Sequence, residues 1–185
     1  MSIPGRLHEA LYFNSSNAFY RSTGFTALGI PDRSFTFALW IRVENAVGNF
    51  LTVTSSRACF IVFGLRSNDQ RLIISLPNAT VSGEGVTIIG PVIPLNQWVH
   101  VAVTWSTTNN AQLYTSMSPS IDNDNATTLR HRQNLPMTVT LGQYRGRISC
   151  GNSSRPFIGS IDEVHIYSTE LTSDDIQELI QLAGV

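Results

Sequence analysis

Short strand-like runs separated by turn residues recur along almost the whole chain. In the run 35–43 the odd positions are uniformly apolar and the even positions are mixed, as in a strand that places one face in a core. Regular spacing of such runs, with one helical pattern at the end, predicts an all-β sandwich. The predicted strands span residues 10–13, 35–43, 50–54, 60–65, 72–76, 86–89, 98–105, 112–115, 137–141 and 157–167.

Composition limits the functional classes that the chain can belong to. With 185 residues, 42% of them hydrophobic, it can bury one sizeable core, so we expect residues 1–185 to form a single domain. The net charge of -1 gives no general attraction to nucleic acid or anionic membranes. No run approaches the roughly 18 apolar residues of a membrane span, so no membrane insertion is expected. The first residues lack the apolar core of a signal peptide, so a secreted form would be part of a larger chain.

The two cysteines are far apart in sequence and leave two interpretations open. Cys59 lies in an apolar strand, whereas Cys150 lies in a loop rich in Gly and Ser. They could form a disulfide, which the chain-entropy model values at about 4 kcal/mol, or they could be a buried thiol and an exposed one. Secretion receives weak support from Asn-x-Ser/Thr sequons, which start at Asn14, Asn78, Asn125 and Asn152.

The C-terminal segment predicts an amphipathic helix. Thr172 can cap its N-terminus, with Asp175 three residues later. We expect this helix to pack on the rim of the sandwich through an apolar stripe of Ile176, Leu179, Ile180 and Leu182.

The strand at 157–167 contains an irregularity at an acidic pair. Ile161 and Val164 are three apart, so a regular strand cannot point both into the core. A bulge near Asp162 and Glu163 would reconcile them. It could turn one carboxylate toward backbone carbonyls, as in a calcium site, or let it accept backbone N–H bonds.

Three segments, 34–40, 97–105 and 157–167, resemble the concanavalin A-like lectin and glucanase superfamily, specifically its laminin-G-like and pentraxin-like domains. They occur in the family's order and at its usual spacing. The resemblance implies a two-sheet antiparallel jelly-roll sandwich with one short C-terminal helix. The family's structural tryptophans and histidine match Trp40, Trp98 and His100, which we interpret as core packing residues.

The resemblance also implies calcium as a cofactor. Asp162 matches an acidic residue that resembles the position of a structural calcium ligand in several relatives. A second candidate calcium site is the oxygen-rich turn that contains Asp122 and Asp124, although such a turn is equally ordinary in solvent.

Candidate ligand-binding residues gather in two further segments. Arg130 with Arg132, and Arg145 with Arg147, would each project from one sheet face and offer forked donors to an anion, unless they are solvated edge arginines. Tyr144 could stack on a sugar face.

Catalysis is not expected from the sequence. Laminarinase-like members of the superfamily carry Glu-x-Asp-x-x-Glu on one strand face, and no Glu-x-Asp occurs here. The histidines show no zinc spacing, and neither a Gly-x-Ser-x-Gly elbow nor a phosphate loop is present.

The resemblance therefore implies a non-catalytic, extracellular or cell-surface recognition module whose partner is a glycan or an extracellular protein. A structural spacer or oligomerisation domain of a larger adhesive protein is the alternative. A divergent glycoside hydrolase is the third hypothesis.

Overall fold

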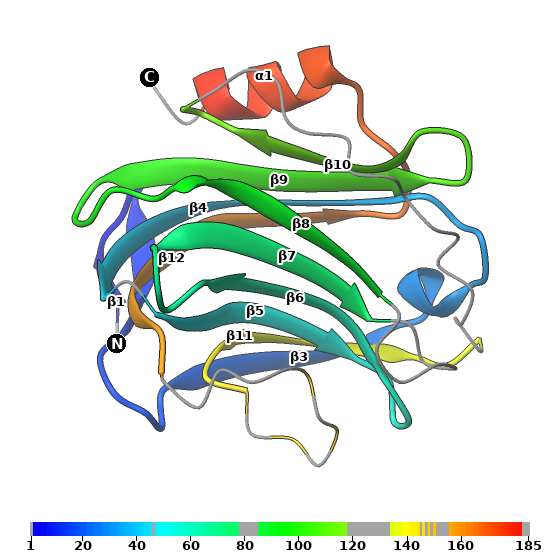
Figure 1. The fold of residues 1–185 in the computed structure, drawn as a ribbon, viewed down its shortest axis with the longest axis horizontal. Coiled ribbons are helices and arrows are strands. Elements are labelled where there is room, and N and C mark those ends of the chain that lie inside the picture. The colour runs from blue at the N-terminus through cyan, green and yellow to red at the C-terminus, as the bar shows by residue number, and fades with distance from the viewer. Residues whose placement is uncertain are drawn as a thin grey trace.

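The computed structural model describes residues 2–45, 47–77, 85–117, 134–144, 146, 148, 150 and 156–182. They form two antiparallel six-stranded sheets packed face to face, with one short helix, α1, against one of them (Figure 1). The predicted all-β jelly-roll sandwich is confirmed. No helix in the described ranges is long and apolar enough to cross a bilayer.

Sheet A has the strand order β1-β2-β12-β4-β9-β10, and sheet B has the order β3-β11-β5-β6-β7-β8. The strands of sheet A are β1 (Ser2–Pro4), β2 (Glu9–Phe13), β12 (Ile158–Tyr167), β4 (Phe35–Asn45), β9 (Trp98–Ser106) and β10 (Asn110–Thr115). Those of sheet B are β3 (Phe19–Phe25), β11 (Met137–Gly142), β5 (Gly48–Thr54), β6 (Cys59–Leu65), β7 (Arg71–Pro77) and β8 (Gly85–Val92). A 3-10 turn, η1 (Ala27–Gly29), and the helix α1 (Ser173–Leu182) complete the fold.

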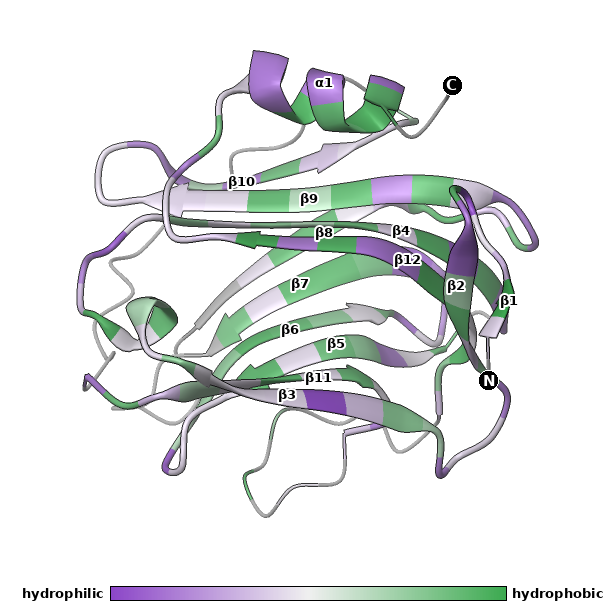
Figure 2. Cartoon of the chain, turned by 180° about the vertical axis from the view of Figure 1, so that it is seen from behind, coloured by the Kyte–Doolittle hydropathy of each residue, from purple (hydrophilic) through white to green (hydrophobic). Residues whose placement is uncertain are grey.

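Aromatic rings from both sheets fill the space between them. Phe37 of β4 meets Phe63 of β6 with 6.0 Å between ring centroids, and Phe35 stacks on Trp105 at 5.7 Å. The odd positions from 35 to 43 are fully buried, as their alternation predicts. Figure 2 shows the result: β7 and β9 are largely hydrophobic, whereas the middle of β3 is hydrophilic.

The even positions Thr36, Ala38 and Trp40 of β4 are buried as well, whereas Arg42 and Glu44 are half-buried. The alternation in the sequence did not indicate the burial of Thr36 and Ala38. Ala38 is covered by α1, because Ile176 packs against Ala38 and Ala102 on the outer face of sheet A. The helix therefore lies across a sheet face, beside the edge strand β10, and the prediction that it packs on the rim is wrong (Figure 1). The small side chains of Ala38 on β4 and Ala102 on β9 form the surface that Ile176 contacts.

Trp40 is covered by the turn between β1 and β2. The Arg6 guanidinium lies 5.0 Å from the centroid of the Trp40 ring, whose other neighbour is the His100 ring at 5.3 Å. Trp40 and His100 are only 5% and 1% exposed, so the prediction that they pack in the interior is confirmed, although they lie on the outer face of sheet A. Trp98 is only half-buried and belongs to none of the hydrophobic clusters of the described residues, so the interpretation of Trp98 as a core packing residue is wrong.

Two strands were not predicted. β1 is short and contains a proline, and β3 reads Phe-Tyr-Arg-Ser-Thr-Gly-Phe without alternation. Each lies at an edge of its sheet, where one side of the strand has no neighbour to impose a pattern.

We predict that His100 makes stability pH-dependent. Burial, with a smaller contribution from the charge of His165, lowers the pKa of His100 from 6.5 to about 4. Below about pH 6.5 the imidazole of His100 is therefore protonated in the unfolded chain but stays neutral in the folded chain. Unfolding free energy should fall as the pH drops from about 6.5 to about 4, by on the order of 3 kcal/mol.

Urea unfolding of the wild type and of His100→Gln across this pH range measures the effect. The variant should be less stable at pH 7 yet should lose less stability on acidification. Equal pH dependence of the two proteins would contradict the prediction.

Candidate functional site

Asp162 fastens the N-terminal turn to the centre of sheet A. Its Oδ2 accepts hydrogen bonds from the amides of Arg6 at 2.7 Å and Leu7 at 3.2 Å, and its Oδ1 accepts one from the amide of Glu163 at 2.9 Å. Gly5 is needed beside it, because a Cβ there would collide with Oδ2 and lie 2.9 Å from the Ala10 nitrogen. The carboxylate thus satisfies backbone donors of two segments far apart in sequence.

The predicted bulge in β12 is present. Asp162 pairs with Trp40 and His165 pairs with Ala38, so β12 has one residue more than β4 in this interval, and Glu163 takes a positive φ of 46°. Ile161 is buried in the core, and Val164 packs against that core. The extra residue also brings the Asp162 carboxylate toward the N-terminal turn.

Both oxygens of Asp162 accept backbone N–H bonds, as the alternative of an amide-bonded carboxylate predicts, and calcium binding at Asp162 stays a prediction. Among the described residues, His, Cys, Asp and Glu side chains nowhere gather in threes or more in a way that could hold a metal ion. Asp122 and Asp124 lie outside the described residues, so calcium binding there stays a prediction.

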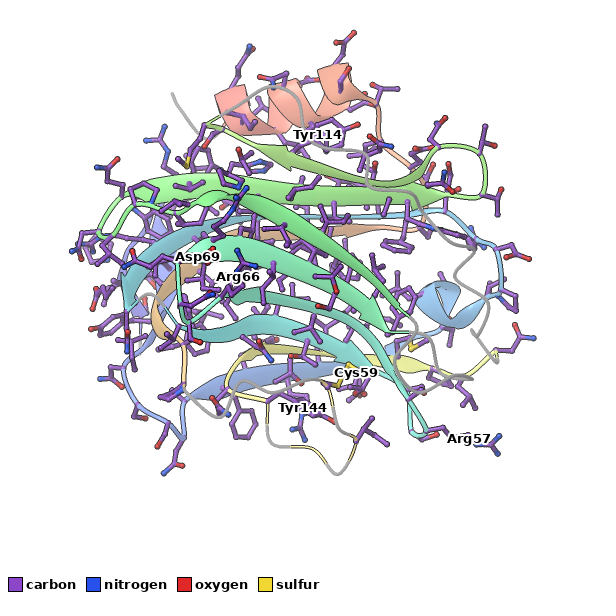
Figure 3. All side chains as sticks on the ribbon, in the orientation of Figure 1. Arg57, Cys59, Arg66, Asp69, Tyr114 and Tyr144 are labelled. Carbon is purple, nitrogen blue, oxygen red and sulfur yellow. A yellow bond between two sulfur atoms is a disulfide. The ribbon has the colours of Figure 1, made fainter. Side chains whose placement is uncertain are left out.

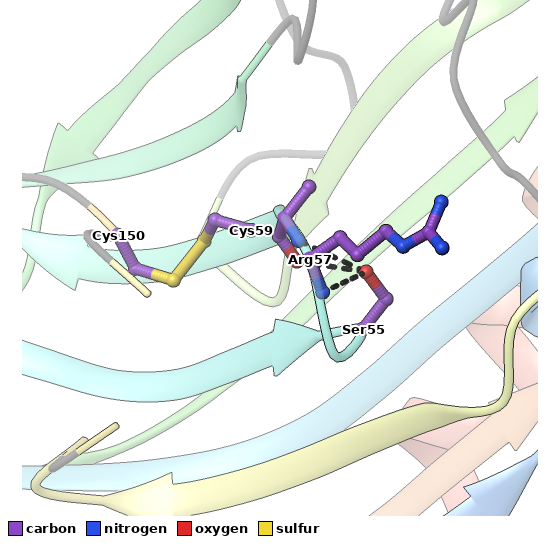
Figure 4. The surroundings of a disulfide bond; sticks show 5 residues. Ser55, Arg57, Cys59 and Cys150 are labelled. Carbon is purple, nitrogen blue, oxygen red and sulfur yellow. Dashed lines mark hydrogen bonds between the residues drawn. A yellow bond between two sulfur atoms is a disulfide. The ribbon is translucent and has the colours of Figure 1, made fainter. Parts of the chain in front are cut away.

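Cys59 and Cys150 form a disulfide, and the bridged alternative is thereby confirmed (Figure 4). Their Cα atoms are 5.3 Å apart. Cys59 starts β6 directly after a tight turn, in which the Ser55 hydroxyl accepts the amides of Arg57 and Ala58 at 3.2 and 3.0 Å. The bridge ties the segment after β11 to sheet B.

Tyr144 belongs to the cluster around this disulfide. With Ile148 it packs against Cys59, Cys150 and Val62, and Val62 points away from the inter-sheet core because its neighbours point into it. Tyr144 is half-buried beside Cys59 (Figure 3). A role for Tyr144 in stacking on sugars stays a prediction.

The predicted arginine pairs cannot be placed. The candidate residues outside the described part of the chain are Arg130, Arg132, Arg145 and Arg147.

A polar cleft of about 520 Å³ lies between β10 and the segment that leads into α1. Gln112 and Tyr114 reach it from β10 because their neighbours Ala111 and Leu113 face the core. Figure 3 shows Tyr114 between β10 and α1. The described lining residues are Asn109, Gln112, Tyr114, Glu170, Leu171, Thr172 and Ser173.

Hydrogen bonds hold the walls of this cleft. The buried Thr36 hydroxyl donates to the Thr169 carbonyl at 2.9 Å and accepts the Leu171 amide at 3.0 Å, which anchors the segment before α1 to β4. The Asn109 side-chain amide donates to both oxygens of Glu170, at 3.1 and 3.2 Å. Because Asn109 lies in the turn between β9 and β10, this contact joins the two walls.

The helix start forms the third side of the cleft. Asp175 Oδ2 accepts the amide and the hydroxyl of Thr172 at 2.8 and 2.7 Å, and the Asp175 amide donates back to that hydroxyl at 3.2 Å. The Thr172 hydroxyl and amide hold the pKa of the Asp175 carboxyl below its ordinary value. This is the predicted N-terminal cap. The Thr172 hydroxyl makes the capping hydrogen bonds, so the Ser173 hydroxyl is not used for capping.

Sequence reasoning missed this cleft. Its residues come from segments about sixty positions apart, and neither segment carries a local binding motif. The only available signal was the run of polar side chains on the even positions of β10.

A family model described as the concanavalin A-like lectin/glucanases superfamily matches residues 15–177. The chain belongs to this superfamily. The matched region contains the cleft, the disulfide and the bulge at Asp162. No curated protein sequence matches the chain.

Solved structures show the same fold at low sequence identity. A heptameric pentraxin from Limulus polyphemus is 20% identical with a TM-score of 0.66, covering 90% of this chain and 78% of its own. A Trypanosoma rangeli sialidase is 15% identical with a TM-score of 0.66, but the match covers 92% of this chain and only 27% of the sialidase. Botulinum neurotoxin type C is 17% identical with a TM-score of 0.60, over 94% and 44%.

We predict that Asp162→Ala destabilises the fold by roughly 1 to 3 kcal/mol, because it leaves partly buried backbone donors without an acceptor. Asp174→Ala, in the exposed first turn of α1, is the control and should cost little. Urea unfolding measures both variants. If Asp162→Ala is as stable as the wild type, the carboxylate does not have this role. A chelator that lowers the melting temperature of the wild type but not of Asp162→Ala would instead show that Asp162 binds calcium.

We predict that the double variant Cys59→Ser/Cys150→Ser loses about 4 kcal/mol of unfolding free energy, because the bridge closes a loop spanning 91 positions of sequence. Wild-type protein unfolded with a reductant is the matched comparison and should behave like the variant. Unchanged midpoints in urea would contradict the prediction, as would two free thiols in natively secreted material.

Proposed function

We propose that this chain is a non-catalytic recognition module that binds a glycan. The observation that carries the proposal is the polar cleft beside α1, which combines amide, carboxylate, hydroxyl and aromatic groups in about 520 Å³. Small-molecule sites typically measure about 300–1,000 Å³ and orient their ligand through a few polar groups. Sugars, which carry many hydroxyls that both donate and accept, suit such a lining.

Three of the described carboxylates are already engaged within the fold, which argues against their use in hydrolysis. A retaining glycosidase needs two carboxyl groups about 5 Å apart, one of them free to attack. Here Asp162 accepts backbone amides, Asp175 caps α1, and Asp69 pairs with Arg66. These groups hold the fold together and are not offered to a substrate.

The comparisons support recognition of glycans in a general way. Cell entry of botulinum neurotoxin type C depends on interaction with two ganglioside molecules, and its structure shares this fold. The sialidase neighbour is an enzyme, but the matched region is about a quarter of it. The disulfide supports an extracellular or cell-surface location, since such bridges persist in oxidising compartments.

A second candidate function, oligomerisation or binding of an extracellular protein, is favoured by the edge strand β3. Phe19 and Tyr20 are 48% and 53% exposed there, and the Arg21 guanidinium lies 5.2 Å from the Phe19 ring centroid. Aromatic side chains on an open sheet edge are typical of protein contacts. A dimer that forms with rising concentration and is lost in Phe19→Ser would support this function.

We predict that the protein binds at least one oligosaccharide on an array that carries neutral, sialylated and sulfated members. We also predict that it releases no reducing sugar from β-glucans. The protein should retain bound sugar without consuming it. Hydrolysis that disappears in Glu170→Gln would overturn the non-catalytic assignment. A silent array together with a concentration-dependent dimer would favour the second function.

A further inference from the structure

We infer that the cleft beside α1 is the glycan site and that it selects neutral sugars over anionic ones. This inference rests on the proposed function and adds the place and the class of the ligand. What the cleft can bind depends on which polar groups around it already hydrogen-bond within the protein and which can still bond to a ligand.

Several lining groups keep hydrogen-bonding capacity. Gln112 donates one N–H to the Asn109 carbonyl at 2.7 Å, which leaves its second N–H and its carbonyl oxygen. The Ser173 and Tyr114 hydroxyls have no hydrogen-bond partner among the described residues, and neither is fully buried. The available groups therefore include both donors and acceptors.

Glu170 sets the charge of the cleft. Its carboxylate accepts only the Asn109 side-chain amide among the described residues, so lone pairs on both oxygens remain. None of the described lining residues is cationic, and Glu170 is the ionisable carboxylate among them. A sugar hydroxyl can donate to this carboxylate in a charge-assisted hydrogen bond, whereas a sialic acid carboxylate or a sulfate would be repelled.

Tyr114 and Leu171 supply the apolar part of the site. Both pack against the small cluster of Ala38, Ala102 and Ile176 beneath the helix, so they are held in place before a ligand arrives. A rigid aromatic side chain next to polar groups suits a sugar ring, which has an apolar face and a hydroxylated edge.

The walls are also fixed in position. The bond between Asn109 and Glu170 joins the β9–β10 turn to the segment before α1, and Thr36 anchors that segment from below. Preorganised walls reduce the ordering cost of binding a weakly held ligand such as a single sugar.

Saturation-transfer NMR of the intact chain tests the inference. The probes are the methyl glycosides of glucose, galactose and mannose, with methyl sialoside and glucose 6-sulfate as anionic counterparts. At least one neutral probe should bind the wild type, and the anionic probes should not. Gln112→Ala and Ser173→Ala should each weaken binding about tenfold, the effect of one lost hydrogen bond.

Gln177→Ala is the matched control, because it makes the same change on α1 outside the lining and should bind like the wild type. Glu170→Gln keeps an acceptor for Asn109 but removes the charge, so it should weaken neutral binding and reduce discrimination against the anionic probes. Circular dichroism confirms that each variant is folded.

The outcomes separate this inference from the proposed function. If sugars bind but the cleft variants bind like the wild type, or only anionic probes bind, the cleft is not the site and the proposed function survives. If neither these probes nor the oligosaccharide array shows binding, both are overturned.

Discussion

The burial of β4 on both of its faces is the constraint on which the rest of the structure depends. Its odd positions lie between the two sheets, and Ala38 and Trp40, at two of its even positions, face outward yet are nearly inaccessible. In many antiparallel sandwiches the outer face of a sheet meets water. Here that face must be covered, and the cover comes from the two ends of the chain: the turn around Arg6 and the helix α1.

The carboxylate of Asp162 holds the N-terminal turn in place over the outer face of sheet A. The turn that carries Arg6 exposes backbone donors toward sheet A, and a regular strand would offer them no acceptor. The extra residue in β12 places the Asp162 carboxylate under these donors. Hydrogen bonds to a charged carboxylate are roughly twice as strong as those between neutral groups. The bulge therefore places a strong acceptor where it holds the backbone of Arg6, whose guanidinium lies over Trp40.

How well each feature could be predicted depends on how local its cause is. The central strands were predicted because burial between sheets imposes an alternation, and the cap by Thr172 was predicted because it involves neighbours in sequence. The bulge at Asp162 followed from the spacing of Ile161 and Val164. The edge strand β3 was missed because an exposed edge imposes no pattern, and the cleft was missed because β9–β10 and the segment before α1 meet only in three dimensions.

The carboxylate of Glu170 is used differently from those of three aspartates that stabilise the fold. Asp162, Asp69 and Asp175 each accept at least one backbone amide, so each stabilises a bulge, a turn or a helix start. Glu170 accepts a side-chain amide instead, and it retains lone pairs beside Gln112 and Ser173. Unlike those three carboxylates, Glu170 accepts no backbone amide among the described residues and lines a polar cleft, which is why we propose that a ligand binds there.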